Sequence, residues 1–554
     1  MIMKNYFMKS SMMLMAVSAA LASCTQEDVL QNTPAQPSDN ELKLSVSTQD
    51  FVSDAQGRAI TNNDETRTSK FENGDQMGLY IFSEDGEVLC DNLLYTYNYN
   101  EDKWTTDKTI YQYKNAQYVA YFPYCKDLSG VAVAENNAEN DAEGGAEGST
   151  PSITASVTKY ITDYFTNNIL PNVSQKDAET YEQADLMVAI ATQVTGEDVS
   201  LALKHQFSMI ELNIPCRKYI TSATNGFQYA APVKMNVKIN EKTDLYRAAD
   251  GVYRMIVAPE TTPVIEGSVE YDENMPIYFS SESEGVTMNA LAAGTFTQFN
   301  VTYTDPAVEG LTVDEATGRY IRPLQPGDYY YSDGTIYPYT EGTVDQPITE
   351  GCIGVIFEVG TGVPNTPWTH GSVLALKSLG QAKWSASRCT VEGNMIETLS
   401  DDVTVKSGYE VTQALVKTSG FLWNDAANLA YNLGKGEYDS QYAAPVYSSG
   451  WYLPSIADWV EVIQNLGGDT DFTLSTTGVS GDVISKIKNY IETIDSGLAT
   501  DYFLKYTLSA TEKNETDAWA LELSGETFKF LNRQKVQNQT SASNKFGACA
   551  VLSF

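Results

Sequence analysis

Residues 42–47 read LKLSVS, and this short stretch sets the pattern for more than half of the chain. Leu42, Leu44 and Val46 alternate with polar residues, which is the two-residue period of a half-buried strand. Similar short segments follow, separated by turn sequences such as NGD at 73–75. No amphipathic helical pattern interrupts them before about Gly420, so the sequence predicts antiparallel β-sandwiches here. The predicted strands include residues 77–82, 118–121, 186–190, 200–203, 207–214 and 233–239.

The sequence pattern changes after residue 305, and residues 418–554 combine helices with strands. In the clearest helix, Ser455 and Asp458 predict a capping box at the start, and Gly467 and Gly468 predict the end. The rear of the chain is therefore expected to be α+β, unlike the front. The predicted helices span 424–433, 455–466 and 482–495, and the predicted strands span 504–510, 518–523, 527–531 and 548–554.

The first residues have the features of a secretion signal. Lys4 and Lys9 precede the uncharged residues 11–23, and residues 21–24 read LASC. A positive end, a short apolar run and small residues describe a secretory signal peptide. LASC resembles the lipobox of bacterial lipoproteins, which implies cleavage between Ser23 and Cys24 and lipidation of Cys24, so we expect a palmitate-bearing lipoprotein. The alternative is an ordinary secretory signal with a chance cysteine.

The charge of the chain limits its partners. Its formal net charge is -36 over 554 residues, with an isoelectric point near 4.3. Nucleic acid is not expected as a partner, because a phosphate backbone is bound through Lys and Arg. Beyond the signal, no apolar run approaches the roughly 20 residues that cross a bilayer. Membrane contact is therefore expected only through the lipid on Cys24, at the outer membrane.

Seven cysteines are present, and six remain if Cys24 carries lipid. They form no C-x-x-C pair, and neither His205 nor His370 lies within five residues of a cysteine. A structural zinc site is therefore not expected. Mostly buried free thiols are favoured, and a Cys352–Cys389 disulfide is the alternative. We expect no metal and no cofactor.

The length of the chain predicts several domains, because a single core stops growing at about 250–300 residues. The insert 134–150 is acidic and rich in Gly, Ala and Asn, which favours a loop rather than a boundary. The predicted divisions are a signal peptide (1–23), a lipidated tether (24–40), two β-sandwiches (41–230 and 231–305), a β-rich leading part (306–417) and a C-terminal α+β domain (418–554).

Short motifs in the front half resemble those of the fimbrillin (Mfa-like, type V pilin) family of surface lipoproteins. Their order and spacing carry the resemblance more than any single motif does. The resemblance covers about residues 40–305 and implies a mainly β fold with two transthyretin-like antiparallel β-sandwich domains. The motifs are TRT (66–68), FENGD (71–75), GLY (78–80), AYFPY (120–124), ADLMVA (184–189), LALKHQF (201–207) and LAAGTF (291–296).

The rear half resembles modules that follow fimbrillin domains, including a domain with Trp-x-Leu-Pro-Ser and Ser-Ser-Thr-Glu boxes. That domain has a C-type-lectin-like or formylglycine-generating-enzyme-like fold. The chain departs from the pattern at Ala510, where serine is usual, and at 548–554, which lacks the usual arginine. The matching stretches are GDYYYSDGT (327–335), IGVIF (353–357), GWYLPS (450–455), LSATE (508–512) and AW (518–519).

Catalysis is not expected from this sequence. Trp423-Asn424-Asp425 matches the calcium signature of C-type lectins, but it opens a predicted helix, so Asn424 or Asp425 is favoured as a helix cap. A hydrolytic triad needs a histidine; His205 lies in a strand-rich stretch and His370 in a predicted turn. Cys549 lies in an apolar stretch that predicts a buried, unreactive thiol. A formylglycine-generating-type enzyme remains a third possibility for the function.

Two arginines follow the first predicted strand. Fimbrillins are matured by a protease that cuts after such an arginine, so the resemblance implies cleavage at Arg58 or Arg67. Arg58 lies in a polar stretch without periodicity, which favours access by a protease. Loss of the first strand would leave a sheet edge that a strand from another pilin subunit could fill. The alternative is that both are exposed arginines that are not processed.

The expected function is therefore that of a fimbrial subunit, and we favour a tip adhesin that binds a host glycan or glycoprotein. The alternative is a glycan-binding surface lipoprotein that does not polymerise. The loop at 533–544 is rich in groups that hydrogen-bond sugars or carbonyls, and loops on a rigid scaffold often carry binding sites. A merely soluble loop is the competing interpretation. The candidate ligand-binding residues are Arg533, Gln534, Lys535, Gln537 and Asn538.

Overall fold

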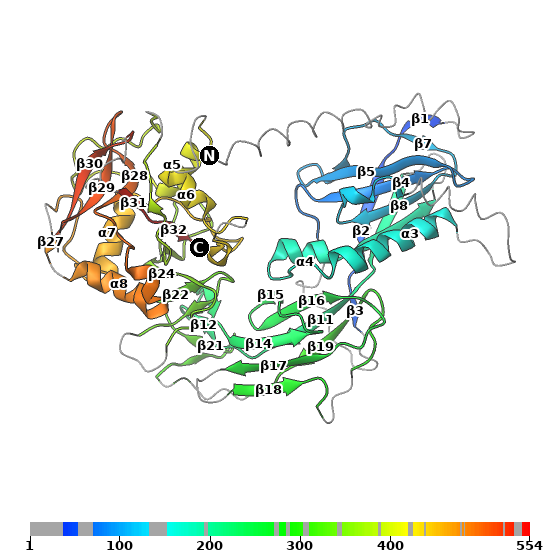
Figure 1. Cartoon of the computed structure of the whole chain (residues 1–554), viewed down its shortest axis with the longest axis horizontal. Helices are drawn as coiled ribbons and strands as arrows, with labels where there is room; N and C mark the ends of the chain where they lie inside the picture. The colour runs from blue at the N-terminus through cyan, green and yellow to red at the C-terminus, as the bar shows by residue number, and fades with distance from the viewer. Residues whose placement is uncertain are drawn as a thin grey trace, which may run out of the picture. The chain divides into compact units, whose positions relative to one another are not determined.

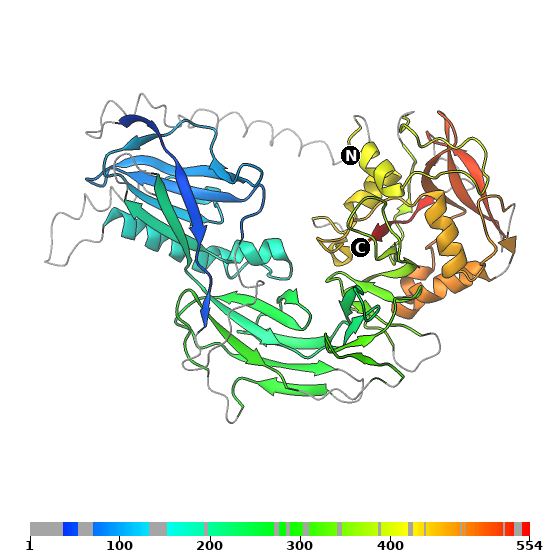
Figure 2. The same ribbon diagram turned by 180° about the vertical axis from the view of Figure 1, so that it is seen from behind.

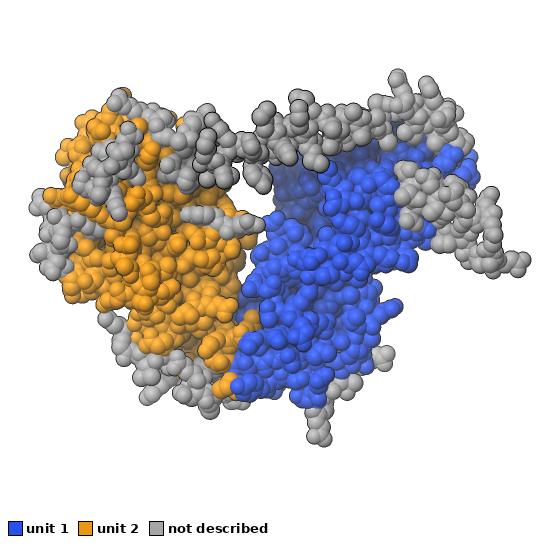
Figure 3. Space-filling view, viewed as in Figure 1, with its two compact units in different colours: residues 1–214, 236–269, 277–302 blue, residues 215–235, 270–276, 303–554 orange. Residues whose placement is uncertain are grey.

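The computed structural model divides the chain into two compact units, each described by itself (Figures 1 and 3). Unit 1 comprises residues 1–214, 236–269 and 277–302, and unit 2 comprises 215–235, 270–276 and 303–554. The structure describes residues 37–53, 70–131, 152–192, 198–270, 276–283, 288–302, 308, 310–340, 346–385, 389–418, 425–436, 439–476, 479–480, 482–524, 527–536 and 546–554.

Unit 1 begins with a seven-stranded sheet in the order β2-β10-β9-β8-β4-β5-β6. Its central strands are buried on both faces; in β4, for instance, Leu79 and Ile81 join one core while Tyr80 and Phe82 join another. Such strands need cover on both sides. The strands are β2 (Leu44–Thr48), β10 (Val199–His205), β9 (Met187–Thr192), β8 (Gln117–Phe122), β4 (Gln76–Phe82), β5 (Val88–Asn98) and β6 (Lys103–Thr105).

Helices in the front half correct the prediction that none precedes Gly420. α3 (Ile153–Tyr164) starts at its cap Ser152, and α4 (Ala178–Ala184) starts at its cap Asp177. Ile153, Val157 and Ile161 form one face of α3 and pack into the core beneath the sheet. Because α3 is rich in Ile, Thr and Val, its composition suggested strand, although the four-residue spacing of those three side chains is helical.

The second part of unit 1 packs a five-stranded sheet, β15-β16-β11-β19-β3, against a three-stranded sheet, β14-β17-β18. Ile239, Ile265 and Val269 of the smaller sheet are fully buried. The strands are β15 (Tyr246–Ala249), β16 (Val252–Val257), β11 (Ser208–Asn213), β19 (Thr295–Asn300), β3 (Val52–Ser53), β14 (Lys234–Ile239), β17 (Ile265–Glu270) and β18 (Pro276–Ser280).

Three ladders of unit 1 are parallel, which corrects the expectation of purely antiparallel sheets. β10 pairs with β2, and β19 pairs with both β11 and β3, in parallel registers. Two of these ladders involve β2 and β3, from the N-terminal end of the described chain. The short connection of a hairpin makes its two strands antiparallel. β2 and β3 instead pair with strands more than 150 residues away, and over that distance the chain can approach in either direction.

Unit 2 contains three sheets around one large core. The orders are β13-β12-β21-β20, β23-β22-β24-β25-β32 and β26-β31-β28-β29-β30-β27. The strands are β13 (Gln228–Ala230), β12 (Lys218–Ile220), β21 (Arg319–Ile321), β20 (Val313–Asp314), β23 (Ile336–Tyr337), β22 (Tyr329–Tyr331), β24 (Cys352–Val359), β25 (Gly371–Ala375), β32 (Val551–Ser553), β26 (Gly380–Gln381), β31 (Phe546–Ala548), β28 (Tyr506–Glu512), β29 (Asp517–Ser524), β30 (Thr527–Gln534) and β27 (Val479–Ser480).

The three helices predicted for the rear half are present. α7 begins with the expected capping box, in which Ser455 and Asp458 each bond the other's backbone N–H. One hydrophobic core joins residues from 306–417 with residues from 418–554, and it also includes Tyr219 and Tyr229. The predicted domain divisions stay predictions. The helices of this unit are α5 (Gly408–Val416), α6 (Ala426–Asn432), α7 (Ile456–Asn465), α8 (Val483–Ile494) and α9 (Ser496–Ala499).

Within the described part of the chain, no helix is both long and apolar enough to cross a membrane. Cys352 and Cys389 are free thiols, so the alternative of a disulfide between them is wrong. None of the described cysteines forms a disulfide, as the favoured interpretation predicted, but only Cys352 and Cys549 are buried, so the prediction of mostly buried thiols is wrong.

Candidate assembly site

The segment 37–53 contributes a strand to each of three sheets of unit 1. Its first strand, β1 (Pro37–Glu41), pairs with β7 (Tyr111–Tyr113), β2 forms the edge of the seven-stranded sheet, and β3 forms the edge of the five-stranded sheet. Figure 2 shows this dark blue ribbon running along the unit. One short stretch thus closes two sheet edges at once.

Backbone hydrogen bonds hold the segment along its length. The N–H of Leu42 donates to the carbonyl of Ile110 at 2.8 Å, and the N–H of Gln49 donates to Leu203 at 2.9 Å. Near the end of the segment, the N–H of Val52 donates to the carbonyl of Gly294 at 2.9 Å. Removal of the segment would leave the facing groups of β10 and β19 without these partners, which is the condition that favours pairing with another strand.

The apolar side chains of the segment complete two cores. Leu42 is buried, and Leu44 and Val46 pack against the same core, as their alternation predicted. Phe51 is buried in the other core, together with Phe207 and other residues. Burying one such side chain fully contributes about 1.5–3 kcal/mol, which is more than the roughly 0.5–1.5 kcal/mol of a single backbone hydrogen bond, so Leu42 and Phe51 add substantially to the three ladders.

Phe51 stacks on a histidine that is itself held in place. The rings of Phe51 and His205 lie 3.7 Å apart with 17° between their planes. Nδ1 of His205 lies 2.8 Å from Oδ1 of Asp185, and both side chains are almost fully buried. His205 ends β10, so it is the structural strand residue that the sequence predicted. Its role as the platform for Phe51 was missed, because the two residues are 154 positions apart.

The residues predicted for processing lie outside the described residues. These are Ser23 and Cys24 at the signal junction, and Arg58 and Arg67 at the proposed protease sites. The structure describes the chain up to Ser53 and again from Lys70. Arg58 lies 5 residues and Arg67 lies 14 residues beyond Ser53, the last residue of the segment 37–53.

The strand β32 is fixed inside unit 2. It pairs with β25 on one side, and Val551 forms a bridge to Tyr452 on the other. Phe554 is buried, stacks on Tyr330 at 4.6 Å, and accepts a hydrogen bond from the N–H of His370 at 2.8 Å. Residues 546–554 are all buried. Withdrawal of this strand would therefore open the core of the unit.

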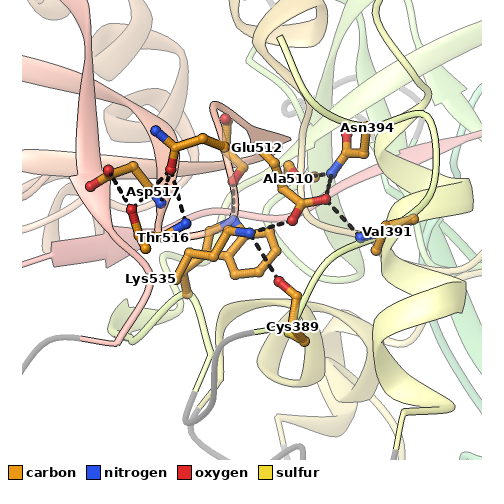
Figure 4. Close-up of polar contacts among 11 residues, drawn as sticks. Cys389, Val391, Asn394, Ala510, Glu512, Thr516, Asp517 and Lys535 are labelled. Carbon is orange, nitrogen blue, oxygen red and sulfur yellow. Dashed lines mark hydrogen bonds and ion pairs between the residues drawn. The ribbon is translucent and has the colours of Figure 1, made fainter. Parts of the chain in front are cut away.

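Lys535, one of the predicted ligand-binding residues, lies in a buried ion pair (Figure 4). Its ammonium group pairs with the carboxylate of Glu512 and donates to the carbonyl of Cys389 at 2.9 Å. The other carboxylate oxygen of Glu512 accepts from the N–H of Val391 at 2.8 Å and from Nδ2 of Asn394 at 3.0 Å. Lys535 is 1% exposed, so the expectation that it meets a ligand is corrected.

The remaining predicted ligand residues lie on or beyond β30. Arg533 covers the ring of Tyr506 at 3.9 Å, and its guanidinium lies 3.8 Å from the carboxylate of Glu522. Gln534 is exposed at the end of the strand. Gln537 and Asn538 lie outside the described residues. Glu512 of the LSATE motif and Lys535, the residue after β30, thus belong to the interior of unit 2.

The residues considered for catalysis are packed against other side chains or buried. His370 stacks on Phe227 at 4.0 Å, and burial lowers its pKa. Burial raises the pKa of the Cys549 thiol to about 12, which disfavours the reactive thiolate. Asp425 is buried at the predicted N-cap position of α6, but its side chain makes no capping hydrogen bond. Trp423 and Asn424 lie outside the described residues. Among the described residues, no group of three or more His, Cys, Asp or Glu is arranged to hold a metal ion.

Comparison with known proteins supports the assignment of the front half. The model of the fimbrillin-like family matches residues 58–317. The similarity to fimbrillins therefore covers a little under half of the chain. A Bacteroides ovatus protein provisionally named fimbrium tip subunit Fim1C is 21% identical over 479 residues, which cover 75% of this chain and 81% of the relative. Both descriptions are those of fimbrial proteins.

Two solved structures are also similar. A fimbrial protein from Bacteroides ovatus is 19% identical, covers 93% of this chain and 99% of its own, and gives a TM-score of 0.41. A Bacteroides uniformis protein, provisionally named as a cell adhesion protein, is 15% identical, covers 52% of this chain and 97% of its own, and gives a TM-score of 0.27. Both scores are too low to establish a common arrangement of the whole chain.

Proposed function

We propose that this protein is an outer-membrane-anchored fimbrial subunit that assembles when the segment 37–53 is cut away and replaced by a strand from another subunit. The observation that carries the proposal is the position of this segment. It forms the edge strands of two sheets and ends just before Arg58 and Arg67. The similarity of residues 58–317 to fimbrillins supports the same role.

The proposed sequence of events follows from these positions. A lipid on Cys24 delivers the chain to the outer membrane, and a protease cuts after Arg58 or Arg67. The cut frees β1, β2 and β3 together, because all three precede both arginines. An incoming strand then pairs with β10 and β19 and must fill the places of Leu42 and Phe51, since the vacated core would otherwise lose its apolar contacts.

We favour a position at the tip of the fimbria. A subunit within a stalk must both accept a strand and donate one. β32 is paired on both sides and buried, so donating it would expose the core of unit 2. A tip subunit needs only to accept. The name of the Bacteroides ovatus relative agrees with this position.

We further propose that residues 418–554 form a C-type-lectin-like module that presents an adhesive surface to a host glycan or glycoprotein. The proposal is supported by the burial of Trp451, Leu453 and Ser455 in the first motif and of Glu512 in the second, because residues of both motifs then build the interior. The alternative function, a glycan-binding surface lipoprotein that does not polymerise, would use the same module without cleavage of the segment 37–53.

Replacement of the two arginines tests the assembly proposal. Arg58→Ala, Arg67→Ala and the double variant would be expressed in a fimbriated host, and sheared filaments would be analysed by N-terminal sequencing. We expect native filaments to start at Ala59 or Thr68 and the double variant to accumulate uncut precursor outside the filaments. Cys24→Ser is the control for anchoring, and it should lose labelling by a fatty-acid analogue.

Normal maturation of the double variant would contradict processing at these arginines. Protein recovered only with lipidated Cys24 as its first residue would instead favour the static lipoprotein.

A further inference from the structure

We propose that the outer face of the β14-β17-β18 sheet is a binding groove for a neutral oligosaccharide. The groove has a volume of about 460 Å³ and lies entirely on residues of unit 1. Its volume falls within the range of about 300–1,000 Å³ that is usual for small-ligand sites. The side chains that the argument uses are Asn236, Lys238, Glu266, Ser268, Tyr278 and Ser280.

The alternation of the three strands places these side chains on one face. In β14, Val237 and Ile239 point into the core, so Asn236 and Lys238, which alternate with them, point outward. In β17, the buried residues are Ile265 and Val269. Glu266 and Ser268 therefore lie on the outer face, as Tyr278 and Ser280 do on β18. The groove is built from adjacent strands of a sheet whose other face is packed, so its polar groups are held on a rigid support.

Gly267 makes the floor of the groove. A Cβ at this position would lie 2.5 Å from the carbonyl oxygen of Asn236 and 2.9 Å from the Cα of Val237, both in the backbone of β14. Any side chain would therefore force β14 and β17 apart. The Cβ would point to the packed face, as the side chains of Ile265 and Val269 do, so the glycine allows the close pairing of β14 and β17 and only its backbone faces the groove.

Tyr278 gives the groove an aromatic wall. It is 79% exposed, whereas the next residue, Phe279, is partly buried and lies 6.0 Å from the ring of Phe299. An exposed ring on a strand offers a flat apolar surface at little entropic cost. The C–H face of a sugar ring is also apolar, while its hydroxyl groups project around the rim. A sugar stacked on Tyr278 would direct those hydroxyls toward the polar side chains of the neighbouring strands.

The polar groups around Tyr278 match a neutral sugar better than an ion or a hydrophobic peptide. Asn236 supplies an amide, and Ser268 and Ser280 supply hydroxyls, each of which can donate and accept. Lys238 and Glu266 line the groove with one positive and one negative charge, and Nζ of Lys238 lies 3.5 Å from Oε2 of Glu241, so its charge is already paired within the protein. The chain as a whole carries -36 at neutral pH, which disfavours an acidic glycan. A neutral oligosaccharide avoids both the repulsion and the cost of leaving these polar groups unpaired.

This inference goes beyond the proposed function, because the groove does not depend on the replaceable segment. The β14-β17-β18 sheet contains no strand from residues 37–53. A subunit that has exchanged that segment would keep the groove intact. The site also differs from the loop at 533–544, where the structure gives Lys535 and Arg533 protein partners.

Binding to immobilised neutral oligosaccharides tests the proposal. Residues 25–554 would be applied to an array that contains galactose-, N-acetylglucosamine- and mannose-terminated sugars, together with sialylated and sulfated versions. We expect binding to a neutral member and weaker binding to its acidic versions. Tyr278→Ala should weaken that binding by about tenfold, because it removes the stacking surface. Tyr278→Phe should keep most of it, since the ring remains.

Tyr99→Ala is the matched control, because Tyr99 is an exposed tyrosine of the same unit at 66% exposure and lies outside the groove. It should bind like the native chain, and all three variants should keep the native melting temperature. The proposal is overturned if no neutral sugar binds, if Tyr278→Ala binds as well as the native chain, or if the groove retains a peptide strand in preference to every sugar. Failure of Arg58 and Arg67 processing would leave this result unaffected, so the two proposals fail independently.

Discussion

The buried charges of this protein show how a residue's role depends on distant neighbours. Lys535 lies in a polar stretch, RQKVQN, that predicts exposure, yet its ammonium meets Glu512 and the carbonyl of Cys389 inside unit 2. Arg254 and Glu211 form a similar buried pair in unit 1, with 2.8 Å between Nη2 and Oε2. Taking a charge out of water costs several kcal/mol, so each partner is tolerated only because the other is present.

This dependence predicts the effect of removing Lys535. Lys535→Met should lower the free energy of unfolding by about 3–5 kcal/mol, because it leaves the Glu512 carboxylate buried without its cation. Denaturant titration of the full chain, followed by tryptophan fluorescence, measures the change. Lys529→Met is the control. Its side chain is 47% exposed and lies 3.3 Å from Glu522, so its loss should cost at most about 1 kcal/mol.

The pair of substitutions Glu512→Gln and Lys535→Met should recover part of the stability, because no buried charge then remains. A Lys535→Met variant as stable as the native chain would mean that Glu512 does not depend on this partner.

At the scale of single helices and strands, the sequence predicts an element correctly when the residues that determine it lie within that element. α7 was predictable because Ser455, Asp458 and the apolar spacing between them and Gly467 are all local. α3 was missed because its β-branched residues outweighed its helical spacing, although the unbroken apolar run MGLYIF in β4 indicated a sheet that needs cover on both faces.

Pairings between distant strands were not predictable in the same way. The alternation in LKLSVS gave the strand and its buried face correctly, but not its parallel partner β10. Likewise, the candidate assembly segment could be located from the sequence, whereas the contact of Phe51 with His205 could not. A pattern of neighbouring residues does not show which distant residue a buried side chain will contact in the core.

The helix α4 carries a carboxyl group whose ionisation opposes folding. Burial, followed by the negative charges of Asp75 and Glu72, raises the pKa of Glu182 to about 7 from its ordinary value of 4.5. The folded chain therefore keeps this proton between about pH 4.5 and 7, where the unfolded chain has lost it. Stability contributed by the protonated group is full below pH 4.5 and is lost as the pH rises through 7.

Glu182→Gln removes this cost and should raise the melting temperature at pH 8 but not at pH 4. Melting curves at both values, followed by circular dichroism, measure the difference. Glu179→Gln removes the same charge from an exposed position of α4 and should not reproduce the gain. An equal shift at both pH values would mean that the effect comes from packing rather than from ionisation.

At the scale of the molecule, the two ends of the described chain differ in how they are held. The segment 37–53 lies along the edges of its sheets, whereas residues 546–554 lie in the interior of unit 2. Both β2 and β32 are the last strands of their sheets, but β2 alternates half-buried with exposed residues while residues 546–554 are all buried, so withdrawal of β32 would expose more of a core. This asymmetry is what a subunit requires if it accepts a strand and donates none.

Replacement of the segment can be reproduced with a peptide. A chain that starts at Ala59 should bind a synthetic peptide of residues 37–53, because the open edges of β10 and β19 and the vacated places of Leu42 and Phe51 remain. The same peptide with Phe51→Ala should bind at least about tenfold more weakly, since a buried Phe→Ala change costs about 3–5 kcal/mol and an isolated peptide recovers only part of that. Isothermal titration calorimetry measures both affinities.

A peptide with Val52→Ala is the control, because Val52 is 63% exposed and its side chain contributes little burial. If the native and Phe51→Ala peptides bind equally, the stacking on His205 does not select the incoming strand. If neither binds while the shortened chain remains folded, the edge closes after the segment leaves, and assembly by strand replacement at this position is ruled out.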